Sequence, residues 1–88
     1  MTLFDTIEGM VSDDYRERFK AEFNQLTIRA RKLKDTIEKY EKGELSYKAT
    51  CDIDILREQL EVMNKYRSIL IYRAYKENIT LLPPEGQA

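Results

Sequence analysis

The 88-residue sequence has no histidine, a single cysteine, three glycines and two prolines. Without histidine, the commonest general base and a common zinc ligand are missing. Cys51 alone can form neither an internal disulfide nor a Cys-His pair. No glycine-rich phosphate loop, CxxC pair or calcium loop occurs. We therefore expect a protein that is not an enzyme and that holds no metal and no cofactor.

Neither sign of charge dominates, because 15 bases face 16 acids and the net charge is −1. A chain without a global positive field has no general attraction for DNA or membranes, so no long nucleic acid is expected as a partner. The longest uninterrupted apolar run, 69–72, is far shorter than a membrane span. The first residues carry acid and no base, unlike a secretory leader. These features predict a cytoplasmic protein.

Helical periodicity is what the sequence does contain. Apolar residues at steps of three and four predict one long helix over about 12–42: Phe19, Phe23, Leu26, Ala30, Leu33, Ile37 and Tyr40. Ser12 suits its N-cap and Gly43 suits a left-handed C-cap.

A second seam with the same steps predicts a long helix over about 50–78, which ends near Asn78: Ile53, Leu56, Leu60, Met63, Arg67, Leu70 and Ala74. Ser46 and Thr50 are both suitable caps for its start. Residues 79–88, which include Pro83-Pro84, are expected to form a loose tail.

Two seams of similar length favour an antiparallel helical hairpin. A short helix over about 3–10 precedes it, and Thr2 with Asp5 would cap that helix. The predicted fold class is all-α, in a single domain over 1–88. A turn centred near residue 46 places Phe23 opposite Leu70.

A further apolar row lies beside the second seam, displaced by one residue: Ile55, Val62, Tyr66 and Ile69. The short N-terminal helix could cover part of this row with Leu3, Phe4 and Ile7. Three or four turns of apolar surface exceed what a two-turn helix hides, so the rest is expected to be a subunit interface. A chain of this length is marginal as a monomer, which also favours a homo-oligomer.

Basic residues gather at the open end of the predicted hairpin. Residues 1–14 hold four acids and no base, whereas 62–76 hold four bases, three tyrosines and no acid. The register brings Tyr15 and Arg16 near Arg73. Because guanidinium groups bind phosphate and tyrosine rings stack on bases, this group suits a nucleotide.

A second basic run, 29–34, contains Arg29 and Arg31. Ordinary solvated helix surface is the alternative explanation for all these charges. Arg67 occupies a seam position, where it would pair with an acid, reach the surface or face a ligand.

Several motifs carry a resemblance to known proteins. They are Tyr15-Arg16-Glu17, Glu22-Phe23, Leu56-Arg57-x-Gln59-Leu60-x-x-Met63-x-x-Tyr66 and Leu70-x-x-Arg73. Over 13–76 the chain resembles small phage-encoded helical-hairpin proteins, which include a crAss-like phage hairpin family and the related anti-CBASS and anti-Thoeris hairpin proteins. The resemblance implies a homo-oligomer, often a hexamer, that sequesters cyclic nucleotide immune messengers without cleaving them.

The anti-CBASS branch holds its ligand with a tyrosine at the helix start and a lysine about four turns later. Tyr15 matches the tyrosine, whereas Ala30 falls near the lysine position, between two arginines. Arg73-Ala74 resembles the Arg-Ala that closes the last helix of these proteins. The expected ligand-binding residues are Tyr15 and Arg73 from the resemblance, with Arg16, Arg29 and Arg31 added on charge alone.

Three functions remain open at this point. The first is a phage-type counter-defence protein that binds nucleotide messengers between subunits. The second is a helical protein-interaction module, an inhibitor or adaptor of a host enzyme that uses the apolar row. The third is a structural assembly protein with no small ligand. Only the first needs the tyrosine-arginine group.

Overall fold

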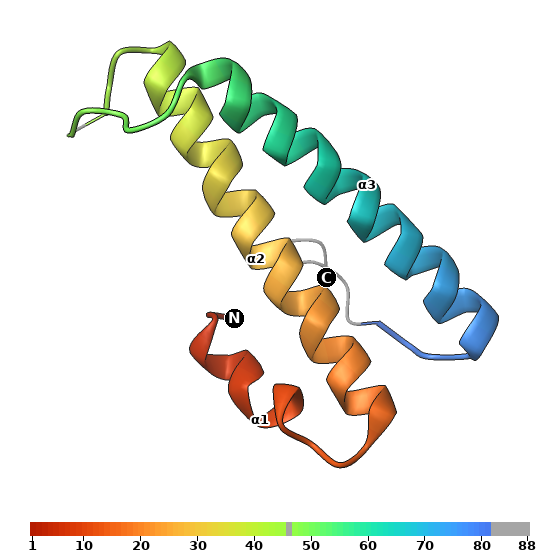
Figure 1. Cartoon of the computed structure of the whole chain (residues 1–88). Coiled ribbons are helices and arrows are strands. Elements are labelled where there is room, and N and C mark those ends of the chain that lie inside the picture. The colour runs from red at the N-terminus through yellow and green to blue at the C-terminus, as the bar shows by residue number, and fades with distance from the viewer. Residues whose placement is uncertain (46, 82–88) are drawn as a thin grey trace.

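The computed structural model describes residues 1–45 and 47–81, and every regular element within them is a helix (Figure 1). A 3-10 turn, η1 (Phe4–Thr6), leads directly into α1 (Ile7–Met10). Two long helices follow, α2 (Tyr15–Glu41) and α3 (Ile53–Glu77). The predicted all-α hairpin with a short N-terminal helix is confirmed. No helix within the described ranges is both long and apolar enough to cross a membrane.

The hairpin core is built from the two predicted seams and is best packed at the open end, where α2 begins and α3 ends. Phe19, Phe23 and Leu70 are at most 5% exposed, and all three belong to one buried cluster. Toward the connection, Ile37 is buried, but Leu33 and Leu60 are only partly buried, and none of the three belongs to that cluster. The strongest packing therefore lies far from the turn that joins the helices.

Contacts between α2 and α3 agree with a turn centred near residue 46. Tyr15 contacts Glu77 at the open end, and its hydroxyl lies 2.8 Å from a carboxylate oxygen. Midway along the hairpin, Arg67 Nε donates a hydrogen bond to Thr27 Oγ1 at 3.1 Å. Both pairs lie where the predicted register places them.

The start of α2 differs from the prediction. Asp14 is the N-cap, because its Oδ1 accepts a hydrogen bond from the Arg16 N–H at 2.9 Å. The helix therefore begins at Tyr15 and not near residue 12. Ser12 Oγ instead accepts from the Asp14 N–H at 3.0 Å, which orders the turn before the cap. At the other end, Gly43 adopts a φ of 69° and terminates the helix as predicted.

The start of α3 also lies later than predicted. The helix begins at Ile53, with Asp52 as its N-cap, and not near residue 50. Of the two predicted caps, Thr50 precedes the helix, and Ser46 lies outside the described residues. An extended backbone at Asp52, with φ −64° and ψ 144°, marks the boundary.

The end of α3 corrects the prediction of a tail that is loose from residue 79. Asn78 adopts the left-handed conformation with a φ of 57°, and the Ile79 N–H donates to the Ala74 carbonyl at 2.9 Å. This turn folds the chain back, so that Ile79 is 7% exposed and joins the core. Leu81 packs against the same core. Residues 82–88, with the two prolines, lie outside the described residues.

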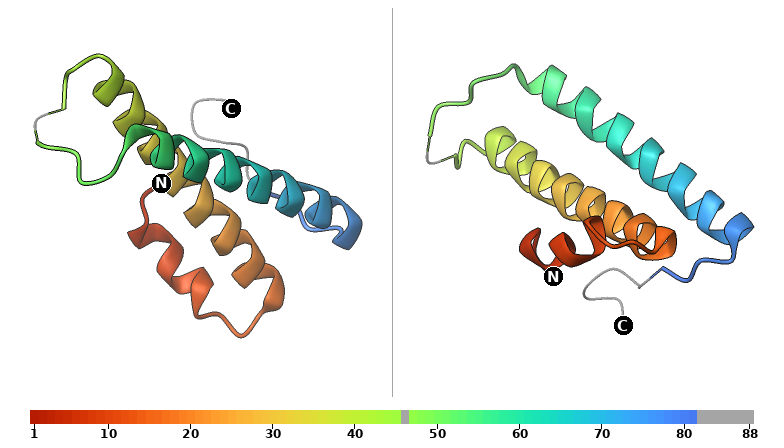
Figure 2. Two further views of the ribbon diagram at one scale, coloured as in Figure 1. Left: turned by 45° about the horizontal axis from the view of Figure 1, so that its top comes forward. Right: turned by 60° about the horizontal axis from the view of Figure 1, so that its bottom comes forward.

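The N-terminal helices pack on α2, which lies between them and α3 (Figure 2). Gly9 permits the close approach, because a Cβ atom there would lie 2.9 Å from Ala21 Cβ and 3.2 Å from the Glu17 carbonyl oxygen. Leu3, and not Thr2, takes the N-cap position, and no side chain among the described residues caps the first turn. The predicted reach of Asp5 back to Thr2 is present, since its Oδ2 accepts from the Thr2 N–H at 2.8 Å and from the Thr2 hydroxyl at 3.2 Å. These hydrogen bonds lower the pKa of Asp5.

The further apolar row of α3 is consequently left exposed by the part of the chain that the structure describes. Its members are 41% to 60% exposed: Ile55, Val62, Tyr66 and Ile69. The possibility that the short N-terminal helix covers part of this row is wrong, because that helix contacts α2 and makes no contact with α3 within the described residues. Its use as a subunit interface stays a prediction.

Candidate functional site

A hydrogen-bonded cluster closes the open end of the hairpin. The Tyr15 hydroxyl donates to Glu77 Oε1 at 2.8 Å, and Arg73 Nη2 donates to the Tyr15 hydroxyl at 2.8 Å. Arg73 Nε also donates to Glu77 Oε2 at 3.2 Å. Tyr15 is the first residue of α2, whereas Arg73 and Glu77 are one turn apart on α3. The cluster therefore ties the start of one helix to the end of the other.

Aromatic contacts fix the orientation of this cluster. The guanidinium carbon of Arg73 lies 5.1 Å from the centroid of the Phe19 ring, within cation–π range. The Tyr15 and Phe19 rings are 6.2 Å apart and tilted by 59°. Phe19 is buried, whereas Tyr15 is 43% exposed. Part of the tyrosine ring therefore remains accessible beside a positioned guanidinium group.

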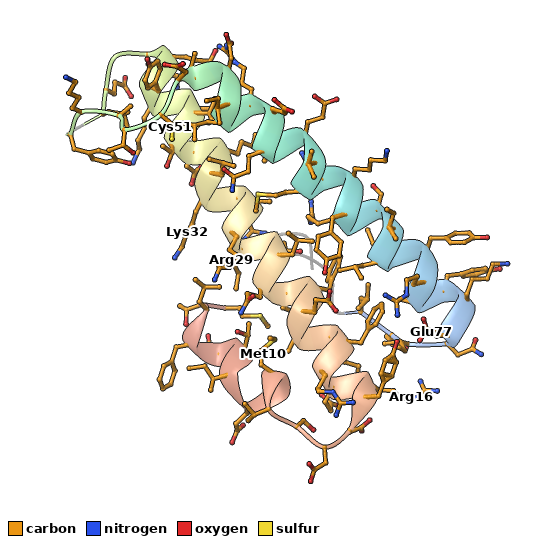
Figure 3. All side chains as sticks on the ribbon, in the orientation of Figure 1. Met10, Arg16, Arg29, Lys32, Cys51 and Glu77 are labelled. Atoms are coloured by element: carbon orange, nitrogen blue, oxygen red, sulfur yellow. The ribbon has the colours of Figure 1, made fainter. Side chains whose placement is uncertain are left out.

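Arg16 lies at the same end of the hairpin, near Glu77 (Figure 3). Its Nη1 donates to the Asn78 carbonyl oxygen at 2.8 Å. The arginine thereby pairs with a carbonyl left unsatisfied where α3 ends. The open-end cluster, defined here as Tyr15, Arg16, Arg73 and Glu77, thus brings together three of the five predicted ligand-binding residues.

Glu77 sets the charge state of the cluster. Its hydrogen bond raises the pKa of Tyr15, with desolvation and the carboxylate charge as further causes. The same carboxylate raises the pKa of Arg73. Tyr15 therefore acts as a neutral donor, and Arg73 keeps its positive charge. Any anion that binds Arg73 must compete with Glu77.

A second tyrosine-carboxylate pair crosses the hairpin about two to three turns further along. The Tyr66 hydroxyl donates to Glu22 Oε2, and this hydrogen bond raises the pKa of Tyr66. Both cross-hairpin tyrosines thus favour the protonated form in the folded state. Their contribution to stability is present below the ordinary tyrosine pKa, about 10, and is lost as the pH rises through the higher folded-state pKa.

We therefore expect alkaline pH to destabilise the wild-type chain more than the Tyr15→Phe/Tyr66→Phe variant, which has no hydroxyl protons to lose there. Urea unfolding at several pH values, with tyrosinate absorbance recorded in parallel, would measure the difference. Parallel losses of stability in both proteins above pH about 10 would contradict the role assigned to these hydroxyls.

The other two predicted residues lie away from the open-end cluster. Arg31 is sixteen residues beyond Tyr15 on α2, which corresponds to about 24 Å along the helix axis. Arg29 borders an apolar groove of about 500 Å³ beneath the N-terminal helices. The five predicted residues therefore do not form a single site within one chain.

Arg31 lines a groove of about 510 Å³ between α2 and α3, which we call the basic groove. It is lined by three bases, two polar residues and two apolar ones: Arg31, Lys34, Arg67, Thr27, Asn64, Ala30 and Leu60. No acid occurs among these described residues. The groove is therefore a surface suited to an anion.

Arg67 reaches the basic groove from its seam position. Besides its bond to Thr27, its guanidinium carbon lies 5.7 Å from the centroid of the Phe23 ring. The sequence predicts that Arg67 pairs with an acid, reaches the surface or faces a ligand. Its contacts are instead with a neutral hydroxyl and an aromatic ring, and its guanidinium group lies at the edge of the groove. Facing a ligand there stays a prediction.

A scan against family models matches residues 13–76 to the Sequestin model. The chain belongs to the Sequestin family. The match spans all of α2 and all of α3 except its last residue. It includes the basic groove and, in the open-end cluster, Tyr15, Arg16 and Arg73. It stops before Glu77 and begins after the N-terminal helices. No curated protein and no solved structure matches the chain.

Membership in the Sequestin family implies a sequestering function, in which the protein binds a small-molecule partner rather than transforming it. This family membership fits the resemblance to sequestering hairpin proteins. The narrower crAss-like grouping stays a prediction. So do the identity of the bound molecule and the oligomeric state.

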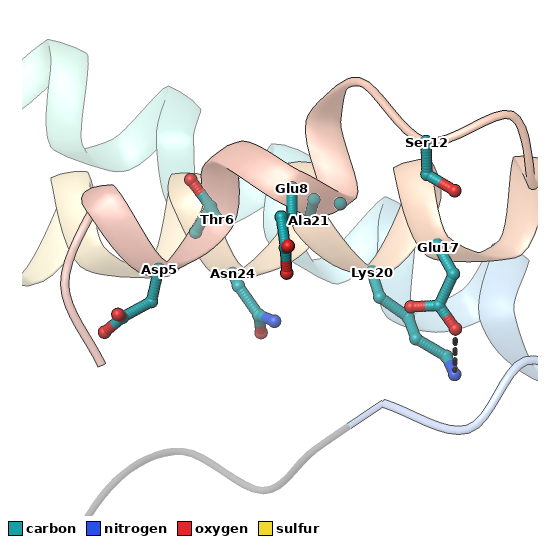
Figure 4. A pocket seen from close by; sticks show the side chains of 9 residues that line it. Asp5, Thr6, Glu8, Ser12, Glu17, Lys20, Ala21 and Asn24 are labelled. Atoms are coloured by element: carbon teal, nitrogen blue, oxygen red, sulfur yellow. Dashed lines mark ion pairs between the residues drawn. The ribbon is translucent and has the colours of Figure 1, made fainter.

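A third hollow of about 390 Å³ lies between the N-terminal helices and α2 (Figure 4). Asp5, Glu8 and Glu17 line it, together with Lys20, whose Nζ lies 3.6 Å from Glu17 Oε1. Its acids make it unsuited to a phosphate group. Among the described residues there is also no group of three His, Cys, Asp or Glu side chains that could hold a metal ion.

Sequence reasoning missed Glu77, Lys34 and Asn64. Glu77 is the first acid after the acid-free stretch 62–76, and its i,i+4 spacing from Arg73 was a signal of the pairing. Lys34 lies in the second basic run, but nothing in that run indicated that Asn64 of the other helix would line the same groove. Comparing the residues that face each other across the hairpin could have identified Lys34 and Asn64 together.

Proposed function

We propose that this Sequestin-family protein is a phage-type counter-defence protein that self-associates and sequesters cyclic nucleotide immune messengers, without cleaving them, in the cytoplasm of the host cell. One observation carries the proposal. A half-exposed tyrosine ring and two guanidinium groups, of Arg16 and Arg73, converge at the open end of the hairpin.

The chemistry of this end suits a nucleotide. The exposed part of the Tyr15 ring can stack on a base, because every base presents a π face. Arg16 and Arg73 can each hold a phosphate by charge-assisted hydrogen bonds. In this proposal, phosphate replaces Glu77 as the partner of Arg73. The basic groove offers three more cations to the same class of ligand.

Binding without cleavage follows from the groups present. The sequence has no histidine to act as a general base. The raised pKa of Tyr15 disfavours its phenolate, which would be the nucleophilic form. Glu77, the nearest carboxylate, is paired with Arg73 and Tyr15. We therefore expect the bound messenger to be released intact when the protein is denatured.

Self-association would place open-end clusters and basic grooves of neighbouring copies beside one another. A cyclic dinucleotide or trinucleotide carries two or three phosphates, whereas one open-end cluster supplies two arginines. The exposed row of α3 is the expected contact surface, and the resemblance implies a hexamer. In this proposal the ligand is bound between subunits.

A thermal-shift panel of cyclic dinucleotides, cyclic trinucleotides and cyclic ADP-ribose isomers tests the proposal. A ligand present at 100 times its Kd should add about 2.7 kcal/mol to the stability of the folded state. Tyr15→Ala should weaken binding of that ligand by about 1–3 kcal/mol, because it removes the stacking surface. Tyr47→Ala, which alters a 61% exposed tyrosine in the connection, is the matched control.

The outcome of the panel decides between the candidates. No shift with any compound, confirmed by calorimetry, would contradict the nucleotide proposal. The exposure of Ile55, Val62 and Ile69 would then favour the second candidate, a protein-interaction module that inhibits or adapts a host enzyme. Recovery of a cleaved nucleotide would instead contradict the argument against catalysis.

A further inference from the structure

Each chain has two apolar surfaces that no part of residues 1–45 and 47–81 covers. The first, which we call the N-terminal patch, consists of Phe4, Ile7 and Val11 on η1 and α1; Phe4 and Val11 are 78% and 76% exposed. Together with Leu3 and Met10 it borders the apolar groove of about 500 Å³. The second surface is the row on α3. Both surfaces are larger than the single, scattered apolar residues that a protein surface normally exposes.

These two surfaces cannot meet within one chain. The N-terminal helices lie on one side of α2 and α3 lies on the other (Figure 2). The close contact of Gly9 with Ala21 fixes the first arrangement, and the core around Leu70 fixes the second. Any contact between the patch and the row must therefore join two copies.

The charges beside the two surfaces are complementary. Glu8 is exposed on α1, directly after Ile7, and lines the hollow between the N-terminal helices and α2. Lys65 lies three residues after Val62 and four before Ile69, so it adjoins the row on the helix surface.

The wider segments follow the same division. Residues 1–14 carry four acids and no base, and 62–76 carry four bases and no acid. Arg67 and Arg73 belong to the basic groove and the open-end cluster, so Lys65 and Lys76 are the bases left for this contact. Arg29, at the inner edge of the groove, is a base that borders the patch. The part of the row in 62–76 is therefore the part that the acidic N-terminal segment fits.

From these observations we infer that the N-terminal patch of one copy docks on the 62–76 part of the α3 row of a second copy. The inference rests on the proposed self-association and specifies which surfaces make it. The contact is heterologous, because it joins different surfaces, and repeating it generates a closed ring when the rotation between copies permits. A pairing of α3 with α3 would leave Phe4 and Val11 exposed.

Two variants with complementary defects test the inference. Phe4→Ser/Val11→Ser removes the patch, and Val62→Ser/Ile69→Ser removes the row; all four side chains are at least 51% exposed, so the fold should survive. Light scattering should find each variant monomeric and the wild-type chain larger. A mixture of the two should form a one-to-one complex of twice 10.5 kDa, because one intact contact remains. Circular dichroism checks that each variant is helical.

Charge exchange gives a second, independent readout. Glu8→Lys and Lys65→Glu should each weaken self-association by about tenfold or more, and the double variant should regain it. Lys48→Glu, the same change in the connection, should have no effect. If both single variants fold normally and the double variant does not regain self-association, the pairing of these two side chains is wrong.

The remaining outcomes separate this inference from the proposed function. A patch variant that still self-associates, or a mixture that stays monomeric, would overturn the inference while nucleotide binding could persist. A wild-type monomer would overturn both the inference and the binding between subunits. The expected complex without any nucleotide binding would contradict the proposed function alone.

Discussion

Leu70→Ala is expected to destabilise the protein by about 3–5 kcal/mol, the range for removing a fully buried leucine side chain. Leu70 is 0% exposed and packs in the cluster that contains Phe19 and Phe23. The rings around it belong to both the core and the open end, so the cavity has little room to collapse. Because small domains are stable by only about 5–15 kcal/mol, this loss is a large fraction of the total stability and should clearly lower the urea midpoint of unfolding.

Leu60→Ala is the matched control, since it removes the same atoms from the same seam. Leu60 is only partly buried, and water can occupy part of the space that its side chain leaves. We expect a loss of about 2 kcal/mol or less. Urea unfolding followed by circular dichroism measures both values. Equal losses at the two positions would show that the core is not concentrated at the open end.

Arg73→Ala and Glu77→Gln should change nucleotide affinity in opposite directions. Arg73→Ala removes a charge-assisted contact worth about 1.5–3 kcal/mol, so affinity should fall about 10- to 150-fold. Glu77→Gln removes the carboxylate that competes with phosphate for the same guanidinium group. The amide also repels phosphate less, so affinity should rise about tenfold. Calorimetry with the ligand found in the thermal-shift panel measures both.

The control for this pair is Arg57→Ala, at the other end of α3. Arg57 is similarly exposed and also pairs with carboxylates, 3.2 Å from Asp54 and 3.3 Å from Glu41. Its loss should leave affinity unchanged. If Glu77→Gln weakens binding as Arg73→Ala does, then Glu77 serves to position the arginine, and its proposed competition with phosphate is wrong.

The hairpin could be predicted because its cause is local and repeated. Phe19, Phe23, Leu70 and Ala74 recur at steps of three and four, and those steps place them on one face of a helix. Seams of similar length then leave few possible registers. The meeting of Tyr15 with Arg73 follows from that register, which is why this part of the candidate site could be predicted as well.

Other features of the fold could not be predicted, because neighbouring residues compete for one role or because the contact involves no periodic apolar residues. Ser12 and Asp14 are both good N-caps, and local sequence does not decide which one the helix uses. The packing of the N-terminal helices on α2 depends on Gly9 against Ala21, two small residues that a search for apolar periodicity overlooks. The inward turn of Ile79 depends on the left-handed conformation of Asn78.

The position of the core has a consequence for how the chain folds. The bond between Tyr15 and Glu77 joins residues 62 positions apart, and the best-packed side chains lie beside it. Growth of the hairpin outward from the connection would bury Ile37 and Ala30 early, but the cluster around Leu70 forms only when the far ends meet. The folding barrier should therefore include closure of most of the chain, which slows folding relative to helical proteins with local contacts. Lengthening the connection would cost little, about 0.6 kcal/mol for each doubling of the loop, so its length is free to vary.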